Sequence, residues 1–271
     1  METQTLQTEK PRAEPLSAKG NPAQFFTLFK GVAEIQPEQD QVELVFTLDK
    51  LSITTMGFGQ AGMVIASIPT KQFSKYTLPD NKETKLGINI QALLELLPKK
   101  GRDITLTSRA GGITIIQDGD IPVELGSVPI IEVKPAQNKE PHIEATALWQ
   151  INTTTFREAL KAASGVGSHI VVATNQENLE ISIEKHDNHM DKLFKQVIRR
   201  IYFSFSNLTF SCTGSEPIKS QYDIGYLIAL TSMADKKGHI EIAYKANDPV
   251  RVEYNSNEVS FRYYLAPYSE Q

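Results

Sequence analysis

Apolar residues recur with helical spacing in four separate stretches of the chain. In each stretch they follow the i, i+3, i+4, i+7 template, which places them on one face of a helix. The four sets are Phe25, Leu28, Phe29 and Val32; Ile90, Leu93, Leu94 and Leu97; Phe156, Ala159, Leu160 and Ala163; and Tyr226, Ala229, Leu230 and Met233. Each stretch therefore predicts an amphipathic helix of about three turns.

Each predicted helix follows a residue whose side chain can cap it. Asn21 precedes Pro22, and Asn89, Asn152 and Asp223 stand before the other three helices. Short side-chain oxygens accept hydrogen bonds from the first free amides of a helix, and proline fits its first turn. These residues therefore predict where the four helices start.

Between the helices the chain consists of short runs of β-branched and aromatic residues separated by turn residues. These runs predict strands over Val42–Leu48, Leu51–Met56, Met63–Ile68, Ile104–Thr107, Ile113–Ile116, Ile170–Ala173, Leu179–Ile183, Ile198–Phe205, Ile240–Tyr244, Val250–Tyr254 and Val259–Leu265. Few helices among many strands are typical of an α+β protein with antiparallel sheets, and not of alternating βαβ units.

The two halves of the chain repeat one plan. The first helices of the halves are offset by 131 residues, from Phe25 to Phe156, and the second helices by 136, from Ile90 to Tyr226. Between the halves lies Val128–Pro141, which holds three prolines in fourteen residues. We predict a disordered tail over 1–11, a domain over 12–127, a connector over 128–141 and a second, similar domain over 142–271.

The composition is that of an ordinary soluble globular protein. Of the 271 residues, 40% are hydrophobic and 22% are charged, and the formal net charge is −4. The single Cys212 cannot form a disulfide within the chain, which favours a reducing compartment. No apolar run is long enough to span a membrane, and the N-terminus lacks the pattern of a signal peptide. We therefore expect a cytoplasmic protein with no membrane partner.

The run Gly57–Gly62 matches the G-x-G-x-x-G pattern of dinucleotide-binding proteins. In those proteins a helix follows, so that its N-terminus can meet the pyrophosphate. Here a β-branched run follows and ends at Pro69, which predicts a turn between two strands. A nucleotide-cofactor enzyme is thus a remote alternative.

Other patterns of enzymatic chemistry are weak or missing. His186, Asp187, His189 and Asp191 cluster in a polar loop, without the closed ligand set that zinc requires. The sequence has no G-x-S-x-G motif, no phosphate-binding loop and no evident histidine partner for Cys212. We therefore predict no catalytic residues, no metal and no cofactor.

Basic residues accompany the four predicted helices. They are Lys30, Lys99, Lys100, Arg102, Arg157, Lys161, Lys236 and Lys237. If the helices line one surface, these side chains could contact DNA phosphates without reading bases. Ordinary solvated helix faces explain them equally well, and Glu95, Glu158 and Asp223 dilute their charge.

The C-terminal region resembles the end of the proliferating cell nuclear antigen family, the DNA sliding clamps of archaea and eukaryotes. The resemblance is carried by Asn247–Tyr254, NDPVRVEY, and by Phe261–Pro267, FRYYLAP. Leu51–Met56, Gly87–Leu94 and Phe156–Leu160 look like further elements of the family. Asn247 stands where the family pattern has Asp.

The resemblance implies the DNA clamp fold: two similar α+β domains, with four helices lining a ring of three subunits and antiparallel sheets outside. Such a ring is a processivity factor that encircles double-stranded DNA without reading its sequence. DNA polymerase, the clamp loader and other PIP-box proteins would dock on it. The resemblance also places the chain on DNA, in the nucleus if the source is eukaryotic.

The resemblance further implies two protein-binding sites. A groove beneath the connector would bind partner peptides through Met56, Val128, Ile130, Ile131, Val133, Pro249, Tyr264, Leu265, Ala266 and Pro267. Ring closure would pair the edges Gly111–Gln117 and Lys192–Val197, through Ile113, Ile115, Ile116, Leu193, Phe194 and Val197.

The chain also departs from the family pattern. Glu95, Glu158, Gly225 and Ser232 align with positions that are usually basic on the inner helices, and the connector's usual apolar pair falls near Asn138 and Glu140. These departures leave open a second reading, a subunit of a heterotrimeric or checkpoint-type clamp.

Overall fold

The structure is a computed structural model of the whole chain. It describes residues 14–35, 40–109, 111–133, 139–174, 179–186, 198–205, 209–212 and 218–268. The predicted tail over 1–11, the predicted edge Lys192–Val197 with Leu193, Phe194 and Val197, and the histidine-rich loop after His186 lie outside the described residues.

Four α-helices form where the apolar pattern predicts them. They are α1 (Pro22–Ala33), α2 (Ile90–Leu96), α3 (Thr153–Ser164) and α4 (Ile224–Leu230). The predicted caps are confirmed: the side-chain oxygens of Asn21, Asn89, Asn152 and Asp223 accept hydrogen bonds from amides in the first turns, at 2.8–3.2 Å. These bonds satisfy amides that have no partner within the helix.

The predicted apolar faces hold for three helices and fail for the fourth. In α1 and α3 all four predicted residues are buried, and of the four predicted for α2 only Leu94 is half-buried. In α4 the buried residues are Ile224, Leu227 and Leu230, so that of the four predicted residues only Leu230 is buried. The run from Ile224 to Leu230 is apolar on nearly every side, so its spacing does not fix which face turns inward.

Eighteen strands complete the described part of the chain. They are β1 (Ser17–Gly20), β2 (Gln41–Phe46), β3 (Lys50–Gly57), β4 (Gly62–Pro69), β5 (Lys75–Thr77), β6 (Thr84–Asn89), β7 (Ile104–Arg109), β8 (Gly112–Gln117), β9 (Val123–Pro129), β10 (Ala147–Asn152), β11 (His169–Thr174), β12 (Leu179–His186), β13 (Ile198–Phe205), β14 (Thr209–Cys212), β15 (Ile218–Asp223), β16 (His239–Tyr244), β17 (Val250–Ser256) and β18 (Val259–Leu265). All eleven predicted strands are present. The turn predicted at Gly57–Gly62 joins β3 to β4, whose ends pair at Gly57 and Gly62.

The element order repeats once along the chain. Each half consists of one strand, a helix, five strands, a second helix and three strands, so that β1–β9 correspond to β10–β18. The predicted duplication is therefore visible in the order of elements, although sequence spacing alone suggested it only through the helices.

The strands form three antiparallel sheets. Five strands pair in the order β5-β1-β7-β8-β9, four in the order β13-β12-β11-β15, and nine in the order β14-β10-β16-β17-β18-β4-β3-β2-β6. The nine-stranded sheet contains strands from both halves, which meet where β18 pairs with β4, from Ser260 opposite Ser67 to Leu265 opposite Gly62. One continuous sheet thus joins the halves.

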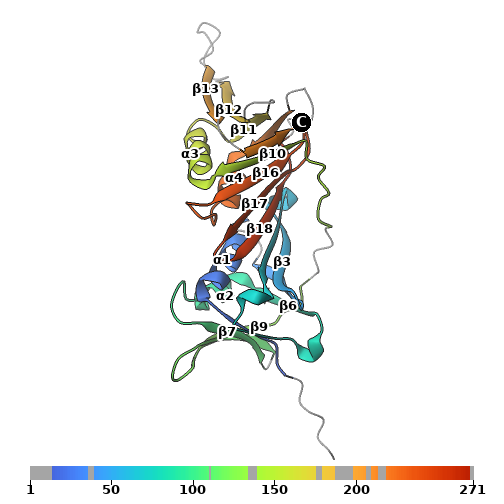
Figure 1. Cartoon of the computed structure of the whole chain (residues 1–271), viewed down its shortest axis with the longest axis vertical. Helices are drawn as coiled ribbons and strands as arrows, with labels where there is room; N and C mark the ends of the chain where they lie inside the picture. Colours follow the sequence, from blue (N-terminus) through green and yellow to red (C-terminus); the bar gives the residue numbers. More distant parts are fainter. Residues whose placement is uncertain are drawn as a thin grey trace, which may run out of the picture.

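The helices and the connector lie on opposite sides of this sheet (Figure 1). Along β18, Phe261, Tyr263 and Leu265 are buried toward the helices, and the Tyr263 hydroxyl donates to the Gly31 carbonyl in α1. Side chains alternate along a strand, so Arg262 and Tyr264 face the other side, which we call the outer face. There they contact Glu140 of the connector.

Each of the two smaller sheets has two outer strands, β5 and β9 in one and β13 and β15 in the other, and these sheets lie toward opposite ends of the molecule (Figure 1). The prediction that Gly111–Gln117 is a free edge is wrong. β8 pairs with β7 on one side and with β9 on the other. Ile113 and Ile115 are fully buried in the core and Ile116 is half-buried, so these residues stabilise the domain itself.

The contact between α1 and the sheet leaves no room for a side chain at Gly31. A methyl group built there would lie 2.5 Å from Cε1 and 2.6 Å from Cζ of the Phe261 ring, which is itself buried. A glycine inside a helix usually costs stability compared with alanine. Here close packing against the sheet explains it.

We therefore expect Gly31→Ala to lower the free energy of unfolding by about 1–3 kcal/mol, the usual cost of overpacking a core. Urea denaturation measures this change. Gly165→Ala is the matched control, because its methyl group would meet only the Ala162 carbonyl, at an ordinary 3.5 Å. A Gly31→Ala protein as stable as wild type would contradict this packing.

Candidate functional site

An apolar row crosses the outer face of the nine-stranded sheet. Met56 on β3 pairs with Met63 on β4, and Met63 pairs with Tyr264 on β18. Directly opposed side chains on neighbouring strands touch, so the three residues form one surface. Met63 was not predicted, although the turn at Gly57–Gly62 already places it opposite Met56.

The ends of β17 and β18 border this row. Val250 pairs with Leu265, which brings the preceding Pro249 level with Ala266, and the Ala266 amide donates to the Ala61 carbonyl at 2.8 Å. Ala266 is exposed, and Pro249 and Pro267 are half-buried. The structure thus gathers four predicted groove residues on one face, namely Met56, Pro249, Tyr264 and Ala266, together with Met63. Pro267 follows directly after the end of β18.

Two predicted groove residues do not lie there. Val128 and Leu265 are each 1% exposed and belong to the hydrophobic core. Val128 lies within β9, and Leu265 points to the helix side of β18 because it alternates with Tyr264. Their assignment to a partner-binding surface is wrong.

The apolar half of the connector follows a different strand. The Ile131 amide donates to the Gly87 carbonyl of β6 at 2.9 Å, and the Ile130 amide donates to the Gly111 carbonyl at 2.8 Å. Ile130, Ile131 and Val133 are half-buried. Three strands separate β6 from β18, a distance of about 19 Å at the usual strand spacing. These residues therefore border the far side of the outer face and do not contact Tyr264.

Glu140 brings the connector onto the apolar row. Its Oε1 accepts a hydrogen bond from the Tyr264 hydroxyl at 2.5 Å and one from Nη1 of Arg262 at 2.6 Å. Arg262 also contacts Glu253 at 3.1 Å, and Arg251 contacts Glu253 at 2.6 Å and Glu241 at 3.6 Å. These five charged residues form a ladder of alternating sign across β16, β17, β18 and the connector.

The contact between Glu140 and Tyr264 shifts the pKa of both side chains. Burial opposes the charge of Glu140, but the hydrogen bonds from Tyr264 and Arg262 outweigh it and hold the pKa of Glu140 below its ordinary value of 4.5. Burial, followed by the bond to Glu140, raises the pKa of Tyr264 well above its ordinary range. At neutral pH the tyrosine is therefore a hydrogen-bond donor and the glutamate is an anion.

The basic residues predicted to meet phosphates lie on or beside the four helices. Lys30 forms an ion pair with Glu34 at 2.8 Å, Nη1 of Arg157 donates to the Ser232 carbonyl at 3.4 Å, and Lys99 lies 5.3 Å from the centre of the Phe26 ring. Lys100, Arg102, Lys161, Lys236 and Lys237 are exposed. The first three are held by contacts within the chain.

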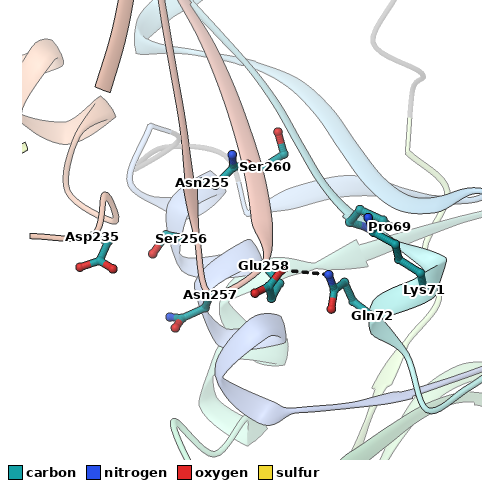
Figure 2. Close-up of a pocket in the computed structure, with 9 residues that line it drawn as sticks. All are labelled: Pro69, Lys71, Gln72, Asp235, Asn255, Ser256, Asn257, Glu258 and Ser260. Atoms are coloured by element: carbon teal, nitrogen blue, oxygen red, sulfur yellow. Dashed lines mark hydrogen bonds between the residues drawn. The ribbon is translucent and has the colours of Figure 1, made fainter. Parts of the chain in front are cut away.

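A polar hollow of about 370 Å³ lies at the turn between β17 and β18. Figure 2 shows Gln72 and Glu258 pointing toward one another, joined by a hydrogen bond of 2.8 Å, with Asp235 on the far side. Its lining carries Lys71 against two carboxylates, and Pro69 is its one apolar side chain. This hollow has neither the charge to attract phosphate nor the apolar surface to hold a peptide.

The chain resembles known sliding clamps both in sequence and in structure. It is 23% identical to the DNA polymerase sliding clamp of Methanococcus vannielii over 231 residues, which cover 83% of this chain and 89% of the relative. The fold matches PCNA from Thermococcus kodakaraensis with a TM-score of 0.80 and 15% identity, covering 93% of this chain and all of that one. The chain is thus similar to PCNA-type sliding clamps in sequence and in fold over most of its length.

A second solved clamp adds a bound partner. The fold matches A. fulgidus PCNA, whose structure holds the C-terminal region of FEN-1, with a TM-score of 0.78 and 18% identity, covering 94% of this chain and 99% of that one. No family model matches the sequence. The clamp fold predicted from the C-terminal motifs is confirmed.

Two further observations concern only the described residues. None of the helices there is long and apolar enough to cross a membrane. The same part of the chain holds no group of three or more metal-ligating side chains.

Glu140→Gln tests the contact between the connector and β18. A carboxylate with a lowered pKa stabilises the folded state above its unfolded pKa, near 4.5, and loses this contribution as the pH falls through its folded pKa. At neutral pH we expect the variant to be less stable by about 0.5 kcal/mol, a small value because the pair is partly exposed and screened by water.

The difference should shrink as the pH falls below 4.5, which urea denaturation at several pH values would reveal. Glu132→Gln, an exposed site on the same connector, is the control and should show no such pH-dependent difference. A stability difference of the same size at pH 3 would contradict the role of the Glu140 charge.

Proposed function

We propose that this chain is a subunit of a DNA sliding clamp, a non-enzymatic ring that encircles duplex DNA and carries replication and repair proteins along it. The observation that carries the proposal is the repetition of the fold combined with the position of β9 and β13 as outer strands of their sheets. The similarity to archaeal sliding clamps supports the same function.

The internal junction supplies a template for ring closure. β18 is the last strand of the second half and pairs with β4, the fourth strand of the first half. The corresponding strands are β9, the last of the first half, and β13, the fourth of the second half. Both are free edges. Pairing β9 of one chain with β13 of the next would repeat the internal junction, and would satisfy backbone groups that are otherwise exposed.

Side chains beside β9 support its role as an interface. Ile121 is 81% exposed and Val123 is 53% exposed, unusual values for large apolar residues. Exposed apolar residues beside a free strand edge favour association with another chain. With two similar domains per chain, three chains would give six similar segments around the ring. The pairing of β9 with β13 is compatible with three identical chains and also with paralogues.

The state of assembly tests this interface. We expect light scattering of the full chain, or of the chain mixed with its paralogues, to give a mass of about three subunits. Ile121→Asp combined with Val123→Asp should weaken association at least about tenfold, because buried unpaired charges are costly. Leu48→Asp is the control, since Leu48 is 63% exposed in the turn between β2 and β3. A strict monomer under all these conditions would exclude the ring.

DNA would pass along the helix-lined face of such a ring. Exposed lysines at helix ends can contact phosphates without reading bases, which suits a ring that slides. Because Lys30 and Arg157 are held by neighbours, Lys161 on α3 is the most available basic residue on the helices themselves. The overall charge of −4 is compatible with this function, since a ring holds DNA by encircling it.

Replacing Lys30, Arg157 and Lys161 by Ala should weaken DNA binding and polymerase processivity. The slope of log affinity against log salt should fall by about one for each phosphate that the variant no longer neutralises, a change measurable by anisotropy with labelled duplex DNA. A pair of single variants supplies the charge-matched control. Lys161→Ala on α3 is compared with Lys245→Ala, which removes the same charge at an exposed site after β16. Unchanged processivity and salt dependence in the triple variant would show that DNA passes elsewhere.

A further inference from the structure

The apolar row and the connector meet at one side chain, Glu140. The Tyr264 residue that ends the row is only 4% exposed, and its hydroxyl is already bonded to the Glu140 carboxylate. The same carboxylate oxygen binds Arg262 on the neighbouring position of β18. Glu140 therefore occupies the polar end of the surface on which a partner peptide would dock.

We propose that Glu140 is a specificity-determining residue of the partner groove, a carboxylate of the chain's own connector that competes with docking peptides for Tyr264 and Arg262. This inference rests on the proposed function, because it assumes that peptides dock on the outer face beside Tyr264.

The hydrogen bonds of Glu140 are strong, and its side chain is exposed enough for a peptide to displace it. Both hydrogen bonds to Glu140 are short, and one joins opposite charges, the class that contributes most. The side chains of Glu140 and Arg262 are nevertheless 42% and 41% exposed, so water can reach both. Because Glu140 belongs to the same chain, its effective concentration at Tyr264 is high and does not fall on dilution.

The other residues of the charge ladder hold Arg262 in place when Glu140 is displaced. Arg262 also contacts Glu253, which in turn contacts Arg251. When Glu140 leaves, Arg262 therefore stays oriented, and the Tyr264 hydroxyl and the guanidinium need a new acceptor. A peptide that supplies an acceptor preserves the hydrogen bonds of Tyr264 and Arg262, whereas a peptide without an acceptor loses them. Glu140 thereby lowers the affinity of peptides that lack an acceptor and so discriminates among partners.

The test measures peptide affinity by fluorescence anisotropy, with a labelled peptide of the FEN-1 C-terminal region as the probe. Glu140→Gln keeps the shape of the side chain and removes its charge. We expect it to bind the peptide about tenfold more tightly than wild type, the effect of one charge-assisted hydrogen bond that no longer has to be broken. Glu132→Gln makes the same change in net charge on the connector and should leave the affinity unchanged.

Tyr264→Phe separates the direct contact from a general effect of charge. It removes the hydroxyl that Glu140 accepts from and keeps the ring. If the proposal is right, the effects of Tyr264→Phe and Glu140→Gln are not additive, because both variants weaken the same contact between Glu140 and Tyr264. Additive effects, or equal gains in Glu140→Gln and Glu132→Gln, would overturn the competition.

The remaining outcomes distinguish this inference from the proposed function. If wild type and Glu140→Gln bind the peptide with equal affinity, the outer face docks peptides but Glu140 does not compete, and the inference alone is overturned. If neither protein binds the peptide, the docking role of this face and the inference built on it are both overturned.

Discussion

The pairing of β18 with β4 is the interaction on which the rest of the structure depends. It joins the last strand of the second half to the first half and makes one sheet of nine strands. Hydrogen bonds along six residue pairs fix the register, and register fixes which side chains face which way. The helices therefore share one face, and the apolar row with its connector shares the other. A change of register by one residue would exchange the two surfaces.

This junction also explains why a short connector suffices. The halves are already held by a sheet, so the segment between β9 and β10 is not needed to keep them together. Its described parts lie on the outer face, where Ile131 bonds to β6 and Glu140 bonds to β18. The two described ends of the connector are thus fixed on strands about 19 Å apart, beside the surface on which we propose that partners dock.

Much of this architecture is visible in the sequence, and the failures have physical causes. Helix caps and apolar faces are local signals, so α1, α2 and α3 were predictable. β9 was missed because Gly126 and Pro129 interrupt its apolar pattern. The edge that the resemblance implied therefore fell on the inner strand β8. The contacts of Glu140 could not be predicted, because its partners Arg262 and Tyr264 lie more than a hundred residues away and meet it only through the folded sheet. The pairing Met56–Met63 was available from the turn between them.

Retention on circular DNA tests most directly whether the repeated junction closes a ring around DNA. The protein, loaded on nicked circular DNA, is washed with high salt, and its retention is measured before and after the circle is cut by a restriction enzyme. A closed ring should remain on the circle at high salt, because encirclement does not depend on charge, and should leave once the DNA is linear. Equal loss from circular and linear DNA at high salt would contradict the account.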